Sequence, residues 1–217
     1  MKNKFWFISA LTICWFINRP TFAADLQTFG PVYASSCANV TGLGAVNWDD
    51  AGNAQGVDDG VFASASLSGD QTRYLRCTDF KIHIASNTRI LGIKLEINNS
   101  RTGLFSHTVT DVDVKLVKDY VIQTANKADV STDWGSASYK TYGGQADTWS
   151  DPTISYADVN LTGFGFIVRG YNDGVPGTNA RVDAGRMTIY YVYTDSIQWW
   201  DQTYPIGGIQ MIGIEAR

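Results

Sequence analysis

Residues 110–117 read T-D-V-D-V-K-L-V, and this alternation of apolar and polar side chains decides the fold class. A period of two residues is typical of a strand with one face in a core and the other in solvent. The pattern predicts an inward apolar set and an outward charged set, which are Val112, Val114 and Leu116 against Asp111, Asp113 and Lys115. An antiparallel sheet with one solvated face is therefore expected here.

The same alternation recurs along the chain, in residues 61–67, 80–84, 93–97, 163–169 and 187–193. Helical periodicity is scarce, and only residues 156–160 could form a single turn. Clusters of turn-forming residues separate the strand-like segments at 86–88, 98–100, 142–144 and 172–174. Together these features predict an all-β protein, an antiparallel two-sheet β-sandwich that is jelly-roll-like.

Composition supports this fold class. The chain has 217 residues, of which 44% are apolar and 18% charged, so it can bury a core and is neither disordered nor a coiled coil. It contains 19 aspartates but only two glutamates, Glu96 and Glu215. Aspartate favours turns and caps whereas glutamate favours helices, so the use of acids also indicates strands and turns.

Residues 1–23 have the layout of a secretory signal peptide. Two lysines precede an apolar run over residues 5–17, and small residues at Thr21 and Ala23 predict cleavage after Ala23. The run is shorter than the roughly 20 residues that a spanning helix needs. We expect a secreted, extracellular or periplasmic protein with a β-sandwich domain over 24–193 and an apolar C-terminal tail over 194–217. No membrane span is expected once the leader is removed.

The charge of the mature chain excludes one class of partner. The leader holds three of the 17 Lys and Arg residues and none of the 21 acids, so 14 cations face 21 acids and the net charge is −7. Binding to nucleic acid requires clustered Lys and Arg. Nucleic acid is therefore not expected as a partner.

Two cysteines remain after Cys14 leaves with the leader. An even pair in an oxidising compartment predicts a disulfide between Cys37 and Cys77. The alternative is two unpaired, buried thiols.

An oxygen-rich loop over residues 48–60 is a candidate metal site. Calcium prefers six to eight oxygen ligands, including carbonyl groups that glycine bends expose. The candidate ligands of this structural calcium are Asp49, Asp50, Asn53, Asp58 and Asp59. The loop lacks the spacing of an EF-hand, and the alternative is a set of Asx turns whose side chains cap backbone amides.

Aromatic residues over 131–156 form a candidate ligand-binding set. Ring stacking combined with nearby polar groups is the chemistry of sugar recognition. The candidates are Trp134, Tyr139, Tyr142 and Tyr156, with Tyr139 and Tyr142 the better surface residues. The alternative is that these rings fill the core, as we expect for Trp149.

The C-terminal tail is apolar, rich in glycine and almost uncharged. Its candidate contact residues are Trp199, Trp200, Ile206, Ile209, Met211, Ile212 and Ile214. It could add a further strand or hairpin that closes the sandwich. Alternatively it could pair with a neighbouring subunit, because an unpaired apolar edge is a template for such pairing.

Several segments carry a resemblance to a known kind of domain. They read D-D-G-V-F-A-S-A-S-L at 58–67, Y-G-G-Q-A-D-T-W at 142–149, D-V-N-L-T-G-F-G-F-I-V at 158–168 and A-R-V-D-A-G-R-M-T-I-Y-Y at 180–191. Their order resembles a β-sandwich domain that recurs in phage-related proteins and in bacterial secreted or surface proteins. The resemblance implies the fold over residues 45–193 and brings no catalytic role.

No catalytic motif accompanies this fold. The mature chain has two histidines, His83 and His107, both expected on the surface, and neither G-x-S-x-G nor H-E-x-x-H occurs. We therefore expect a non-catalytic structural or interaction module, on a surface, outside the cell or on a virion, that assembles with itself or a partner. The alternative is a carbohydrate-binding module with a structural calcium.

Overall fold

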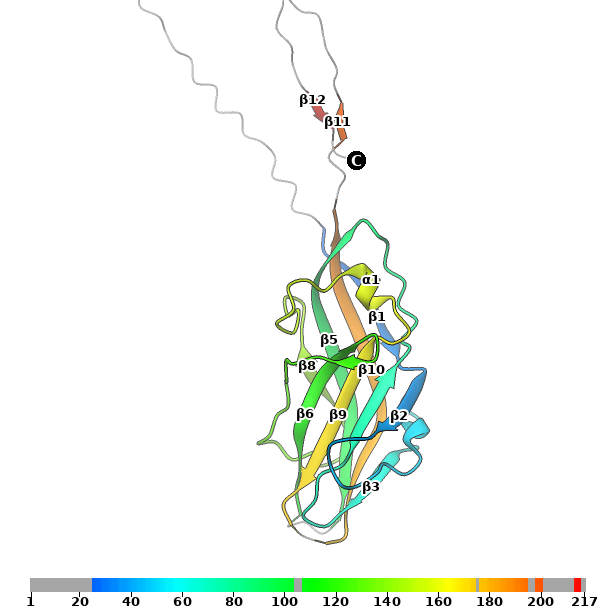
Figure 1. Ribbon diagram of the computed structural model, residues 1–217, viewed down its shortest axis with the longest axis vertical. Helices are drawn as coiled ribbons and strands as arrows, with labels where there is room; N and C mark the ends of the chain where they lie inside the picture. Colours follow the sequence, from blue (N-terminus) through cyan, green and yellow to red (C-terminus); the bar gives the residue numbers. More distant parts are fainter. Residues whose placement is uncertain (1–24, 104–106, 175, 195–197, 201–212, 216–217) are drawn as a thin grey trace, which may run out of the picture.

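Two antiparallel β-sheets pack face to face in this protein (Figure 1). The computed structural model describes residues 25–103, 107–174, 176–194, 198–200 and 213–215. The predicted all-β, two-sheet sandwich is confirmed. The predicted signal peptide lies outside the described residues.

The first sheet has the strand order β1-β10-β5-β8, and β3 also pairs with β10. Its strands are β1 (Gln27–Tyr33), β3 (Ala63–Leu67), β5 (Thr88–Thr102), β8 (Ser138–Gly143) and β10 (Thr178–Tyr193). The second sheet has the order β2-β4-β9-β6-β7. Its strands are β2 (Ser36–Val40), β4 (Tyr74–Thr78), β6 (Val109–Lys118), β7 (Val121–Ile122) and β9 (Gly165–Asn172). The chain alternates between the sheets from β1 to β6 and again from β7 to β10, which makes the sandwich jelly-roll-like.

Two short helices lie in the connections. One is the 3₁₀ helix η1 (Ala51–Ala54), and the other is α1 (Tyr156–Val159), the single turn that the sequence predicts. A capping box begins α1, because the Ser155 hydroxyl accepts from the Asp158 amide while the Asp158 carboxylate accepts from the Ser155 amide.

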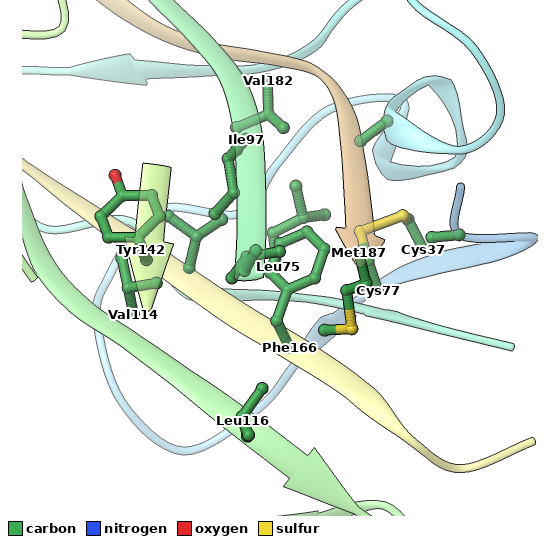
Figure 2. Close-up of a cluster of buried hydrophobic side chains, with 14 of the residues drawn as sticks. Cys37, Leu75, Cys77, Ile97, Val114, Leu116, Tyr142, Phe166, Val182 and Met187 are labelled. Carbon is green, nitrogen blue, oxygen red and sulfur yellow. A yellow bond between two sulfur atoms is a disulfide. The ribbon is translucent and has the colours of Figure 1, made fainter. Parts of the chain in front are cut away.

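The core lies between the sheets and draws on both of them. Ile97 and Met187 of the first sheet meet Val114, Leu116 and Phe166 of the second (Figure 2). All five are at most 2% exposed. Alternation in β5 and in the second half of β6 therefore places the predicted apolar residues inward.

The predicted disulfide is confirmed. Cys37 and Cys77 are direct cross-strand partners on β2 and β4, and their sulfur atoms are 2.05 Å apart (Figure 2). The bridge lies against the core, with both cysteines buried.

One half of β6 faces the opposite way from the prediction. The pairing of β6 with β9 shifts by one residue between Asp111 and Asp113, so Val112 is the extra residue of a bulge. A one-residue shift exchanges the faces of every residue before it. Asp111 is consequently 1% exposed and points into the core, whereas Val112 is only half-buried. The predicted inward Val112 and outward Asp111 are both wrong.

Three further local predictions need correction. Residues 80–84 keep the expected faces, with Phe80, Ile82 and Ile84 buried, but they form no strand. Lys81 has a left-handed backbone conformation, and the segment is an irregular connection from β4 to β5. Residues 98–100 are not a turn but lie within β5, fully buried. His107, expected on the surface, is 3% exposed, and its Nδ1 lies 2.6 Å from Thr178 Oγ1.

The described part of the tail adds no strand to either large sheet. Strands β11 (Gln198–Trp200) and β12 (Gly213–Glu215) pair with each other, with Trp199 opposite Ile214. Four predicted contact residues lie outside the described residues, namely Ile206, Ile209, Met211 and Ile212. Within the described ranges, no helix combines the length and apolar character needed to cross a membrane.

Candidate functional site

The outer side of the first sheet carries a cluster of polar and aromatic side chains, which we call the polar face. Its orientation follows from Gly185 of β10, where a Cβ atom would lie 2.3 Å from the Phe166 ring, so Gly185 faces the core and Arg186 faces outward. Cross-strand partners share a side of the sheet, and Arg186 pairs with both Tyr33 and Glu96. The polar face comprises Tyr33, Lys94, Glu96, Asn98, Tyr139 and Arg186.

Glu96 is the centre of an ion-pair network on this face. Its two carboxylate oxygens accept from Arg186 Nε and Nη2, each at 3.1 Å, and Lys94 Nζ lies 3.1 Å from Oε2. Burial alone would raise the pKa of Glu96, but hydrogen bonds from Arg186 and Lys94 outweigh burial and hold the pKa below its usual value. This network fixes the Arg186 side chain across β5 and β10.

Arg186 also covers the ring of Tyr139. Its guanidinium carbon lies 4.0 Å from the ring centroid, a cation–π contact. Burial raises the pKa of Tyr139, and its hydroxyl lies beside Tyr33 without hydrogen-bond geometry. With one ring face covered by Arg186, Tyr139 can offer a sugar at most its other face.

Two aspartates meet at the edge of the polar face. Asp183 is the extra residue of a bulge in β10, is 1% exposed, and accepts from the backbone amides of Asp59 at 3.2 Å and Gly60 at 3.0 Å. The Asp58 carboxyl group lies in contact with that of Asp183 and accepts from Asn98 Nδ2 at 2.6 Å. Burial, together with the adjacent Asp58, raises the pKa of Asp183. The loop over 58–60 is thereby tied to β5 and β10.

Among the predicted calcium ligands, Asp58 brings its side chain to Asp183, and Asp59 contributes a backbone amide. The Asn53 amide nitrogen donates to the Phe62 carbonyl at 3.2 Å, and the Asp59 carboxylate accepts from the Val61 amide at 2.9 Å. Asp49 pairs with Ser64 through its backbone, and Asp50 precedes η1 in a left-handed conformation. In the described part of the chain, no three His, Cys, Asp or Glu residues gather as a metal cluster. Calcium therefore stays a prediction.

The predicted ligand-binding aromatics divide between surface and core. Trp134 is 1% exposed and stacks on Trp48 with ring centroids 6.3 Å apart, and Tyr142 is 5% exposed. The prediction of Tyr142 as a surface residue is wrong, because its hydroxyl reaches inward to Asp111. Tyr156 is half-buried against the core, and Tyr139 alone lies on the polar face. Trp149 is buried, as expected.

An open groove of about 550 Å³ runs beside β8. It is lined by Lys127, Ala128, Asp129, Thr132, Lys140, Thr141, Tyr142 and Gly143. Both lysines are already engaged, because Lys127 pairs with Asp147 at 2.6 Å and Lys140 donates to two loop carbonyl groups. The groove offers hydroxyl, ammonium and carboxylate groups to a polar ligand.

Sequence reasoning missed Asp183, Asn98, Glu96 and Arg186. Asp183 meets the loop over 58–60 only through a contact between positions 124 residues apart, which no local pattern indicates. Asn98 was missed because residues 98–100, Asn-Asn-Ser, were predicted to form a turn. Glu96 and Arg186 are direct cross-strand partners on β5 and β10. Their ion pair can be predicted only when the register of these two strands is known.

Comparison with known proteins identifies no relative. No protein-family model matches the chain, and no curated protein or solved structure matches it significantly. The resemblance to phage-related and bacterial surface domains therefore depends on the strand and turn residues alone.

Proposed function

We propose that this chain is an exported, non-catalytic interaction module that assembles with itself or with another surface or virion protein. The observation that supports this function is the separation of the tail from the sandwich. Both sheets are built from strands between Gln27 and Tyr193, while β11 and β12 pair with each other. The sandwich is therefore complete without the tail.

The chemistry of the tail favours a partner. An isolated two-stranded hairpin is marginally stable at best in water, and it gains stability by joining further strands or an apolar surface. The strands β11 and β12 are three residues each and belong to an apolar segment. Docking of this hairpin on another subunit would supply the missing contacts.

The tail leaves the sandwich at an end where apolar side chains are exposed. Gln27, the first residue of β1, pairs with Tyr191 near the end of β10, so the chain enters and leaves the sandwich at the same end (Figure 1). Leu26 is 38% and Tyr193 46% exposed there, and Tyr193 packs edge-on against Tyr191 at 5.8 Å. The sandwich therefore has exposed apolar side chains at the end where the tail begins, and we propose this end as part of the contact surface.

Export is supported by two features. The first 23 residues have the layout of a signal peptide, and the Cys37–Cys77 disulfide fits an oxidising compartment.

A pair of charge substitutions tests the assembly. Ile212→Asp and Gln202→Asp each place one carboxylate in the tail, but only Ile212→Asp buries that charge if the apolar side chains form the contact. We expect light scattering to give an oligomeric mass for the mature chain and for Gln202→Asp, and a lower mass for Ile212→Asp. Equal monomeric masses for all three proteins would contradict self-assembly.

The groove beside β8 supports a second candidate function, carbohydrate binding. Its size and its hydroxyl, ammonium and carboxylate groups suit a small, hydroxyl-rich ligand. A glycan array tests this candidate, with Thr141→Arg to fill the groove and Ser66→Arg, at the exposed position of β3, as the control. If the Thr141→Arg variant still binds the glycan, the groove is not the binding site.

A further inference from the structure

We propose that Asp58, Asp183 and Asn98 bind a calcium ion at the edge of the polar face. The site combines a loop residue with residues of β10 and β5, and it differs from the loop site that the sequence predicts. Asp58 is common to both, whereas Asp183 and Asn98 replace Asp49, Asp50, Asn53 and Asp59. The proposal does not depend on the tail or on the assembly proposed above.

The first observation is the contact between two carboxyl groups. Asp183 is 1% exposed and Asp58 lies against it from the solvent side, with no Lys or Arg ion-paired to either within the described residues. Two adjacent carboxylates repel unless one is protonated or a cation lies between them. A divalent ion would neutralise both, and the exposed side at Asp58 gives the ion a route from solvent.

The second observation is a buried oxygen atom without a hydrogen-bond partner. Asn98 is 3% exposed, its Nδ2 contacts Asp58, and its Oδ1 receives no hydrogen bond from any described residue. Native proteins rarely leave buried polar atoms unsatisfied, and a bound ion is one of the accepted explanations.

The Asn98 amide can supply a ligand without moving its backbone. Half a turn about the last side-chain bond exchanges Nδ2 and Oδ1 at almost unchanged shape, and the two arrangements are distinguished only by their partners. After this exchange a carbonyl oxygen replaces the nitrogen that now contacts Asp58 at 2.6 Å. Three oxygen ligands from Asp58, Asp183 and Asn98 would then face one ion.

The ligand chemistry selects calcium among common cations. All three side chains offer oxygen, which favours hard cations over zinc or copper. Magnesium requires near-ideal octahedral geometry and keeps most of its water, whereas calcium accepts irregular sets of carboxylate, amide and water oxygens. The amides of Asp59 and Gly60 already hold Asp183 in place, so the carboxylate is oriented before the ion binds.

The test uses the mature chain, residues 24–217, after treatment with a chelator. Calcium chloride should raise the unfolding midpoint by several degrees, and magnesium at equal concentration should raise it less. Terbium should bind with luminescence sensitised by Tyr139, and calcium should displace it. Asp58→Asn, an exposed position that should not disturb folding, should weaken terbium binding at least tenfold, as should Asp183→Asn. Asp49→Asn, in the same loop, should leave binding unchanged.

Three results would overturn the proposal. A midpoint unmoved by calcium and by chelator would show that no ion binds. If Asp49→Asn weakens terbium binding as much as Asp58→Asn does, the ion binds in the loop over residues 48–60 instead. If calcium leaves the unfolding midpoint unchanged but the Asp58→Asn substitution raises it, the two aspartates share a proton instead of an ion. None of these results bears on assembly, so the two proposals fail independently.

Discussion

The carboxylate of Asp111 accepts a hydrogen bond of 2.8 Å from the indole nitrogen of Trp134 inside the sandwich. The same carboxylate accepts from the Tyr142 hydroxyl at 2.8 Å and from the Asp129 amide at 3.0 Å. One buried acid thus joins β6 to β8 and to the segment over 129–134. The bulge at Val112 is what turns this acid inward.

The first prediction removes the charge of Asp111 while keeping its shape. In Asp111→Asn one acceptor oxygen becomes an amide nitrogen, which faces either the Trp134 indole donor or the donors of Tyr142 and Asp129. We expect the free energy of unfolding to fall by about 1–3 kcal/mol, the cost of leaving a buried donor unsatisfied. Urea denaturation measures this change. Asp50→Asn, at an exposed position with no side-chain capping bond, is the control and should change stability by less than about 0.5 kcal/mol.

The second prediction concerns the pH dependence of this acid. Burial raises the pKa of Asp111, although the hydrogen bonds from Asp129, Tyr142 and Trp134 oppose the rise. A raised pKa in the folded state means that the contribution to stability is complete below the ordinary value of 3.8 and is lost as pH rises through the folded pKa. The stability advantage of the wild type over Asp111→Asn should therefore be larger at pH 3 than at pH 7. A larger advantage at pH 7 would contradict this direction.

Glu96 gives the third prediction, with the opposite sign. Its pKa is lowered because the hydrogen bonds from Arg186 and Lys94 outweigh burial, so its contribution is present above the ordinary value of 4.5 and is lost as pH falls through the folded pKa. Glu96→Gln should cost about 1–2 kcal/mol at pH 7 through weakened charge-assisted hydrogen bonds. This cost should shrink as the pH is lowered below 4.5. An unchanged cost at pH 3 would show that packing, not charge, is responsible.

The fourth prediction tests the contact of β10 with the core. A Cβ atom at Gly185 would lie 2.3–2.4 Å from two ring carbons of Phe166. Gly185→Ala should therefore lower the free energy of unfolding by about 1–3 kcal/mol through overpacking. At Gly144 a Cβ atom would meet nothing within 4 Å, so Gly144→Ala is the matched control. Equal stability of the two variants in thermal unfolding would mean that Phe166 repacks freely.

The fifth prediction concerns the disulfide between Cys37 and Cys77. The bridge closes a loop with a sequence separation of 40 residues, so the chain-entropy relation gives a stabilisation of roughly 3–4 kcal/mol. The paired variant Cys37→Ala/Cys77→Ala should unfold at correspondingly lower urea concentration. A reductant should shift the wild type toward the variant and leave the variant unmoved. Equal urea midpoints would show that the bridge adds nothing to stability.

Much of the fold follows from local sequence, and the exceptions have physical reasons. Strict alternation identifies β5 through residues 93–97, and even cysteine usage identifies the bridge. A bulge escapes detection because one extra residue reverses the faces of its strand without changing the sequence period. Residues 98–100 resemble a turn because Asn and Ser favour turns, but pairing on both sides within β5 overrides that preference.

The site was less predictable than the fold. Aromatic residues in a loop-rich segment resemble a binding surface until their hydrogen-bond partners are known. The partner that draws Trp134 inward is Asp111, which lies 23 residues earlier in the chain, so no local pattern indicates the contact. Asp58 was found because its loop is rich in oxygen ligands. Asp183 and Asn98 were not, because both meet Asp58 only through tertiary contacts of β10 and β5.

Light-scattering mass after size exclusion tests the central claim most directly, on residues 24–217 and 24–194 side by side. Both sheets lie within the shorter chain, so we predict a folded monomer with an unchanged unfolding midpoint for 24–194 and an oligomer for 24–217. Equal monomeric masses would contradict assembly through the tail. A truncated chain that unfolds would contradict it as well, because the tail would then belong to the core of the sandwich.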